Sequence, residues 1–351
     1  MGANDTFRGD RDKRDTASEV RLVGEIGLVD YPSCQESAIY GLGDVFRVAS
    51  DYATDTDDQP AAIRVSTWTV SGTGPDAGMV CTFDSHPGTE HRLSHIIVPP
   101  SLVVPEDMTN VDTLGDWIRD LKSGGTILCA VCAGVFVLAE TGMLDGRDAT
   151  THWAFADYLA TQFPKIRVDA ARMVIDDIDI ITAAGILAWV DLGLTLVDRL
   201  LGPSVMLHTA RFILADPPRR QQRTYQEFTP RLRHGDKEVL TAQTFIHANA
   251  GRQLAVAELA QVAGVQPRTF QRRFKEATGS TLTEYLQSVR VAKARESLEL
   301  SRTSVEQIAM DVGYLDVSTF RRLFQRTTGL TPSEYRKRFG IADGRPERRY
   351  P

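Results

Sequence analysis

The chain has 351 residues, of which 42% are hydrophobic and 25% charged, an ordinary composition for a globular protein. Its formal charge of −6 argues, taken alone, against binding to nucleic acid, but that charge is unevenly divided. Residues 236–351 hold 19 Lys and Arg against 13 Asp and Glu, net +6, whereas residues 1–235 hold 21 against 33, net −12. Such asymmetry indicates nucleic-acid contact by the basic part.

Several classes of protein are excluded. No run approaches the roughly 18 consecutive apolar residues of a membrane span, so no membrane partner is expected. Residues 1–18 are charged, lack the apolar region of a secretory signal and are expected to be a disordered tail. Four cysteines make no disulfide framework, which favours a reducing cytoplasm. The spacings typical of metal sites and nucleotide-binding loops are missing, so no metal or cofactor is expected.

Residues 19–215 predict an α/β domain, because strand-like apolar runs alternate with stretches of helical periodicity. Several runs are uninterrupted, which is typical of a buried, mainly parallel sheet flanked by helices, here a flavodoxin-like fold. The expected strands cover residues 20–30, 62–70, 79–83, 93–98, 126–131 and, as an edge hairpin or strand, 173–184. The expected helices cover residues 34–50, 107–122, a stretch from 133, and 186–215.

The pattern changes after this domain. Residues 216–235 are rich in proline and arginine and are expected to be a linker. Residues 236–340 are helical in pattern throughout, with no strand-like run, and predict an all-α domain. Residues 341–351 are expected to be a basic tail.

An internal repeat in the helical part is the most specific signal in the chain. The segment RTFQRRFKEATGSTLTEYLQ (268–287) recurs as STFRRLFQRTTGLTPSEYRK (318–337). Just upstream, LAQVAGV (259–265) recurs as IAMDVGY (308–314). Each unit therefore consists of a helix, a glycine-containing turn and a second helix, which is the helix-turn-helix pattern.

The second helix of each unit carries two phenylalanines four residues apart, which are expected to face the core. The polar residues at its N-terminal end then remain exposed, as they are on a helix that contacts base edges. Arginine can pair with guanine, and glutamine with adenine, in the major groove. The predicted DNA-binding residues are Arg268, Thr269, Gln271, Arg272, Ser318, Thr319, Arg321 and Arg322.

Residues 239–339 resemble the AraC/XylS family of transcription regulators, in which a long helix, here expected over residues 282–298, joins two helix-turn-helix units. The resemblance implies two recognition helices in successive faces of the major groove, about 34 Å apart. It places the base contacts on the eight residues named above. It also implies double-stranded promoter DNA as a partner, and RNA polymerase if the protein is an activator.

In the α/β part, Cys132 stands where a buried strand is expected to meet a helix, and His152 follows 20 residues later. A helix N-terminus lowers the pKa of a thiol, so the two residues are candidates for a nucleophile and its base. The alternative interpretation is that Cys132 and His152 have no catalytic role and are simply packed in the core.

This part resembles the ThiJ/PfpI branch of the class I glutamine amidotransferase-like fold, and with the AraC-type part it resembles the GlxA family of regulators. The resemblance implies that Cys132 is the cysteine of the nucleophile elbow and His152 the active-site histidine. Active members place an acid in the first helix at the position of Ala38, and Glu36 stands about 200° of helix rotation away from it. No enzyme activity is therefore expected. Cys132 and His152 remain vestigial catalytic candidates, and a ligand pocket is expected at Glu36, Cys132 and His152.

The sequence thus predicts a cytoplasmic, sequence-specific DNA-binding transcription regulator, nucleoid-associated when bound, with a small molecule as candidate effector. The apolar helix over residues 185–202 either packs on the sheet or forms the interface of a homodimer, which would raise the effective affinity for DNA. Two alternatives remain: a cysteine-dependent hydrolase or hydratase of the ThiJ/PfpI type, and a thiol redox sensor that uses Cys132.

Overall fold

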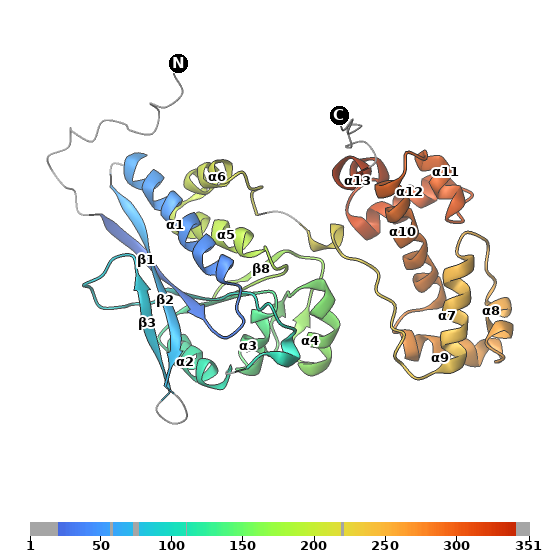
Figure 1. Cartoon of the computed structure of the whole chain (residues 1–351), viewed down its shortest axis with the longest axis horizontal. Coiled ribbons are helices and arrows are strands. Elements are labelled where there is room, and N and C mark those ends of the chain that lie inside the picture. Colours follow the sequence, from blue (N-terminus) through green and yellow to red (C-terminus); the bar gives the residue numbers. More distant parts are fainter. Residues whose placement is uncertain (1–19, 57–58, 73–76, 110, 219–220, 342–351) are drawn as a thin grey trace, which may run out of the picture. The chain divides into compact units, whose positions relative to one another are not determined.

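The computed structural model divides into two compact units, Met1–Gln222 and Arg223–Pro351 (Figure 1). The division falls inside the segment 216–235 that the sequence predicts as a linker. The predicted tail 1–18, and all of the predicted tail 341–351 except its first residue, lie outside the described residues. The structure describes residues 20–56, 59–72, 77–109, 111–218 and 221–341.

The first unit is built on a mainly parallel sheet, as the sequence predicts. The bounds of its strands are β1 (Arg21–Asp30), β2 (Ala61–Ser71), β3 (Gly78–Asp84), β4 (His95–Val98), β5 (Ile127–Val131), β6 (Asp148–Ala149), β7 (Arg167–Val168), β8 (Val174–Asp177) and β9 (Ile180–Ala183). Seven strands form one sheet in the order β3-β2-β1-β4-β5-β9-β8, and β6 and β7 form a separate pair. The five central strands run parallel, and the edge strands β3 and β8 pair antiparallel with their neighbours.

Helices lie on both faces of this sheet. Their bounds are α1 (Glu36–Thr56), α2 (Val111–Ser123), α3 (Gly134–Glu140), α4 (Ala156–Gln162), α5 (Trp189–Leu201) and α6 (Pro203–Phe212). Helices α1, α5 and α6 cover one face, while α2 and α3 lie against the other (Figure 1). Short 3-10 helices cover Pro105–Asp107, Trp153–Phe155 and Gln222–Thr224.

The helix predicted over residues 186–215 is two helices in the structure. Gly202, with φ of 88°, and Pro203 separate α5 from α6, because glycine adopts this backbone conformation readily and proline cannot continue a helix. Packing inside the unit explains the leucines of α5: Leu192, Leu194 and Leu196 are fully buried. Their burial corresponds to the first of the two alternatives given for this helix, packing in the core.

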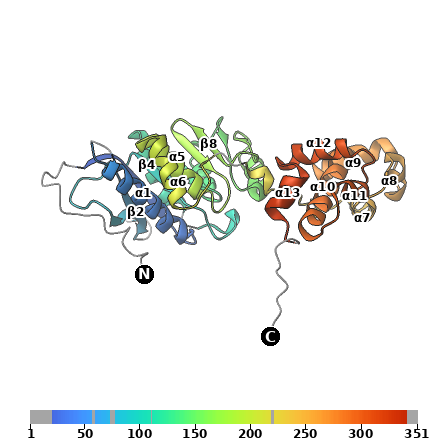
Figure 2. The ribbon, with the colours of Figure 1, turned by 90° about the horizontal axis from the view of Figure 1, so that it is seen from above.

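The second unit is all-α, as predicted. Its helices are α7 (Lys237–Asn249), α8 (Val256–Val262), α9 (Pro267–Thr278), α10 (Leu282–Leu300), α11 (Val305–Asp311), α12 (Val317–Thr328) and α13 (Pro332–Phe339) (Figures 1 and 2). Helices α8 and α9 form the first helix-turn-helix pair, and α11 and α12 the second. Each pair has its own buried core, and α10 contributes residues to both cores. None of the helices in the described residues is long and apolar enough to cross a membrane.

The two helix-turn-helix pairs repeat each other in detail. The rings of Phe274 and Tyr285 meet edge-on at 5.1 Å, and their counterparts Phe324 and Tyr335 meet edge-on at 5.4 Å. The repeat in sequence is therefore a repeat in packing.

The ends of the recognition helices repeat as well. Gly279 and Gly329 end α9 and α12 in the left-handed conformation, with φ of 77° and 79°. Thr281 and Thr331 then begin α10 and α13, each with a capping box that satisfies two backbone amides. These caps fix where each recognition helix stops.

Candidate nucleic-acid interface and cysteine elbow

Helix α9 presents the four residues that the sequence predicts on the first recognition helix. Pro267 occupies its first turn, where the missing N–H costs nothing. Phe270 and Phe274 are fully buried, which turns the intervening face of the helix outward. The predicted DNA contacts on this helix are all exposed: Arg268, Thr269, Gln271 and Arg272.

Helix α12 presents the other four. Its N-cap is Asp316, whose carboxylate accepts the amides of residues 318 and 319 at 3.1 and 2.8 Å. Phe320 and Phe324 are fully buried, so this helix has the same orientation in its core as α9. The predicted contacts on it are likewise exposed: Ser318, Thr319, Arg321 and Arg322.

Some of the predicted DNA-binding side chains already have partners within the protein. Arg272 forms an ion pair with Glu276 at 2.9 Å, and Arg321 with Glu306 at 2.6 Å. Both pairs are largely exposed, and exposed pairs contribute at most about 1 kcal/mol, so a phosphate or base edge can compete for either arginine. The hydroxyl of Thr319 donates to the Asp316 carboxylate at 2.5 Å, which makes that hydroxyl the least available of the eight predicted contacts.

Cys132 is on a sharp turn between β5 and α3. Its φ of 55° is rare for a residue with a side chain and indicates a strained backbone. The turn is held by neighbouring elements: the Cys132 amide donates to the Ala183 carbonyl at 2.8 Å, and the Thr151 hydroxyl donates to the Cys132 carbonyl at 2.7 Å. The predicted elbow is therefore present.

A close approach of two elements keeps the elbow tight. A Cβ at Gly134 would lie 2.5 Å from the Pro99 carbonyl oxygen and 2.7 Å from that of Val98. Only glycine leaves room for the end of β4 to touch the first turn of α3. Cys132 itself is buried, with 3% of its surface exposed.

The electrostatic state of Cys132 differs from the sequence-based expectation. Burial raises the pKa of this thiol to about 11, and the amides of Ala133 and His152, which hydrogen-bond to the sulfur, offset only part of that effect. The thiolate expected from the helix N-terminus is thus not favoured, because removing the group from water outweighs the two backbone hydrogen bonds to the sulfur.

The imidazole of His152 makes no hydrogen bond to the thiol of Cys132, although the backbone amide of His152 does. Its Nδ1 accepts the amide of Ala154 at 3.1 Å, and its ring contacts those of Trp153 and Phe155. Burial lowers the pKa of His152, so the imidazole is neutral at neutral pH. A second polar group near the elbow is Tyr31, whose hydroxyl donates to the Pro99 carbonyl at 2.7 Å.

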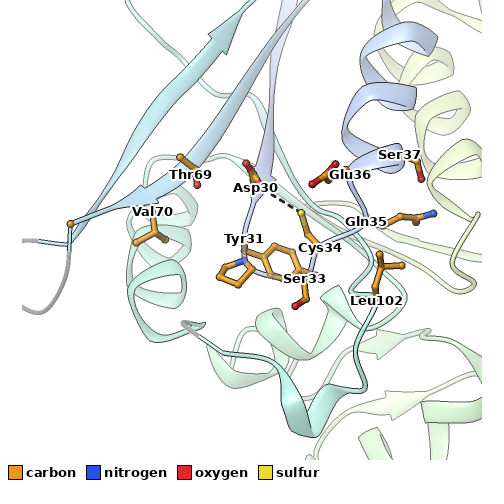
Figure 3. Close-up of a pocket in the computed structure, with 12 residues that line it drawn as sticks. Asp30, Tyr31, Ser33, Cys34, Gln35, Glu36, Ser37, Thr69, Val70 and Leu102 are labelled. Atoms are coloured by element: carbon orange, nitrogen blue, oxygen red, sulfur yellow. Dashed lines mark hydrogen bonds between the residues drawn. The ribbon is translucent and has the colours of Figure 1, made fainter.

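A cavity of about 860 Å³ lies at the carboxyl end of β1, where the chain turns into α1 (Figure 3). Glu36 and Asp30 supply its charged side chains, and Thr69 and Val70 of β2 face them. Ligands of open parallel sheets bind at this end of the strands. The remaining lining residues are Tyr31, Pro32, Ser33, Cys34, Gln35, Ser37, Gly72 and Leu102.

The predicted pocket set is only partly brought together. Glu36 lines the cavity, whereas Cys132 and His152 do not. Glu36 is exposed and Ala38 fully buried, which agrees with the rotation expected between the two positions and leaves no carboxylate at Ala38.

Cys34 also lines the cavity but is not among the pocket residues predicted from the sequence. Its thiol lies 3.5 Å from the Asp30 carboxylate, and burial raises its pKa to about 11. Its place at the end of the first predicted strand was the available signal. Among the described residues, no group of three or more His, Cys, Asp or Glu side chains could hold a metal ion.

Comparison with known proteins covers both units. Residues 89–199 match the DJ-1/PfpI family and residues 259–338 match a helix-turn-helix domain. The chain is 31% identical over 181 residues to the isonitrile hydratase of Pseudomonas putida, an alignment that covers 51% of this chain and 72% of the enzyme. The chain therefore belongs to the DJ-1/PfpI family, in the branch that joins this domain to an AraC-type helix-turn-helix domain.

Two relatives are named as regulators. The chain is 29% identical over 202 residues to the HTH-type transcriptional regulator CdhR of Pseudomonas aeruginosa, covering 57% of this chain and 60% of that protein. It is 29% identical over 214 residues to the HTH-type transcriptional regulator GlxA of Rhizobium meliloti, covering 60% and 65%. The chain thus spans less than two thirds of the length of these curated relatives in alignment.

Proposed function

We propose that this protein is a transcription regulator that binds double-stranded promoter DNA in a sequence-specific manner through α9 and α12. The observation that carries this proposal is the repeat of one geometry: two recognition helices, each ending at a left-handed glycine and each presenting four predicted contacts to solvent. The net charge of +6 on residues 236–351 supports it, because phosphate attraction supplies much of the affinity for DNA. The names of the two regulators agree with this function.

The test is selection of bound sequences from a random duplex library with the full chain, followed by affinity measurements. Arg272→Ala and Arg322→Ala are each expected to lose about 1–3 kcal/mol of specific binding, because a bidentate contact to a base is removed. Arg119→Ala, an exposed arginine of α2, is the matched control and should bind like wild type. Unchanged affinity of both recognition-helix variants, or no enriched sequence, would contradict the proposal.

The α/β unit is proposed to carry a homodimer contact and to bind a small-molecule effector. A dimer would place two DNA-binding units on one site and raise affinity without new contacts. The cavity at Asp30 and Glu36 is the proposed effector site, and RNA polymerase is a further partner if the protein activates transcription. Light scattering at micromolar concentration should give a dimeric mass. The proposed location is the cytoplasm, where the protein would associate with the nucleoid when it is bound to DNA.

We infer that catalysis by Cys132 is not the main activity, although the elbow and the isonitrile hydratase relative favour that alternative. Three observations on this chain weigh against it: the buried thiol with its raised pKa, the engaged Nδ1 of His152, and Ala38 in place of an acid. Cys132→Ala should therefore retain control of target genes. Loss of that control, with the variant still folded, would support the hydratase or redox alternative.

A further inference from the structure

Residues 223–235, which the sequence predicts as a linker, pack along the helical unit and are called the strap below. Its first part is held by Arg295 of α10, which is 8% exposed. The guanidinium donates to the carbonyl of Arg223 at 3.1 Å and to the carbonyl of Gln226, and it lies over the ring of Tyr335 at 5.4 Å. A charge that stays buried is costly to leave without its acceptors, so this attachment is firm.

The second part of the strap is attached to the other helix-turn-helix pair. Phe228 meets the ring of Tyr285 edge-on at 5.1 Å and packs against the core of the first pair. The buried side chain of Gln243 in α7 donates through its amide nitrogen to the carbonyl of Arg231 at 3.0 Å, and its amide oxygen accepts from His234 Nε2 at 2.9 Å. The strap therefore spans both pairs.

Two strap arginines lie at matching positions of the repeat. A Cβ at Gly329, which ends α12, would stand 3.0 Å from Arg223 Nε. A Cβ at Gly279, which ends α9, would stand 3.4 Å from Arg231 Nη1. A helix C-terminus carries a partial negative charge, so a guanidinium placed there is favourable. Each recognition helix thus ends against an arginine of the same short segment.

We propose that the strap sets the relative orientation of α9 and α12, with Arg223 and Arg231 as positioning residues. The two helix-turn-helix pairs have separate cores and share α10, and they also meet where Gln253 donates to the Gly313 carbonyl at 2.9 Å. The strap adds a further connection that reaches both pairs and resists pivoting of one on the other. The orientation matters because two recognition helices on one duplex must match the separation of their half-sites. This proposal rests on the proposed DNA-binding function.

The test uses the full chain and the DNA site selected by wild type. Duplexes with one or two base pairs inserted between the two half-sites are compared with the original site by fluorescence anisotropy. Wild type should lose about tenfold or more in affinity on insertion, since a rigid pair of helices cannot follow the displaced half-site. The double variant Arg223→Ala/Arg231→Ala should bind the original site more weakly and lose most of that discrimination.

Two further variants make the result interpretable. Arg231→Ala alone removes an exposed side chain, so this variant should fold even if the double variant does not. It should lose part of the discrimination between half-site spacings. Arg233→Ala, an exposed arginine of the same strap, is the matched control and should discriminate like wild type. Thermal unfolding followed by circular dichroism shows whether each variant is folded.

A role in phosphate contact would give a different pattern. Loss of a phosphate contact would weaken binding equally at every spacing and reduce the salt dependence by about one ion per residue. Full spacing discrimination in folded Arg231→Ala and in the double variant would overturn the proposal while leaving DNA binding intact. If wild type enriched no sequence from the library, the proposed function itself would fail, and the strap proposal with it.

Discussion

At the scale of single residues, Cys132 illustrates what the sequence could and could not provide. A buried strand followed by small residues located the elbow, because the turn is encoded locally. The state of the thiol depends on segments far away in sequence, including the loop at Thr151 and His152, and these bury the sulfur. The helix N-terminus beside Cys132 therefore does not predict a lowered pKa, because desolvation by these segments raises it.

The first prediction concerns the reactivity of Cys132. With a pKa of about 11 against an ordinary value of 9.0, its thiolate population at pH 7 is about a hundredfold below that of an ordinary cysteine. Alkylation by iodoacetamide, followed peptide by peptide with mass spectrometry, should be slow at pH 7 and rise steadily up to about pH 11.

The denatured chain supplies the control, since all four cysteines should then react alike. Cys81, which is partly exposed, should react faster than Cys132 in the native protein. A plateau of the Cys132 rate near neutral pH would mean a stable thiolate and would return the redox-sensor and hydrolase alternatives to consideration.

At the scale of elements, local sequence patterns predicted most of the helices and strands. The alternation of apolar runs with helical periodicity predicted the parallel sheet, and the offset repeat predicted both recognition helices. The break between α5 and α6 was missed although Gly202-Pro203 is a strong turn signal, because the apolar periodicity continues across it. The strap was missed for another reason: several of its hydrogen bonds are accepted by its own backbone carbonyls, which carry no sequence signature.

The second prediction tests the contact between β4 and α3. Gly134→Ala places a methyl group within 2.7 Å of two backbone oxygens, so the strand and helix must separate. The expected loss of stability is about 1–3 kcal/mol, measured by urea unfolding. Gly43→Ala in α1 is the matched control, because nothing lies within 4 Å of its Cβ and alanine favours a helix interior by up to about 1 kcal/mol. Equal unfolding midpoints for the two variants would refute the close approach as a constraint.

At the scale of the whole molecule, the charge division predicted the functional division. The acidic part forms the α/β unit and the basic part the helix-turn-helix unit, so the total of −6 conceals two surfaces of opposite sign. The exact start of the basic unit could not be predicted. The chain leaves the first unit at Gln222, whose side-chain amide donates to the carbonyls of Thr151 at 3.0 Å and Ala170 at 2.8 Å. The next residue, Arg223, already belongs to the strap.

The last prediction follows from this boundary. A fragment of residues 223–351 keeps the strap, whereas one of residues 236–351 deprives the Arg295 guanidinium of its carbonyl acceptors and removes Phe228 from the first core. An unpaired buried charge costs about 3–5 kcal/mol, so the shorter fragment should unfold at clearly lower urea concentration.

Arg295→Met in the shorter fragment separates the two contributions. Replacing the unpaired charge by an apolar side chain of similar length should recover part of the lost stability in the shorter fragment. In the longer fragment the same change should lower stability, because it removes the hydrogen bonds from Arg295 to the strap carbonyls. If the strap contributed only the apolar surface of Phe228, the methionine would recover nothing. Coincident unfolding curves for the two fragments would show instead that residues 223–235 are a linker after all, and that they do not hold α9 and α12 in place.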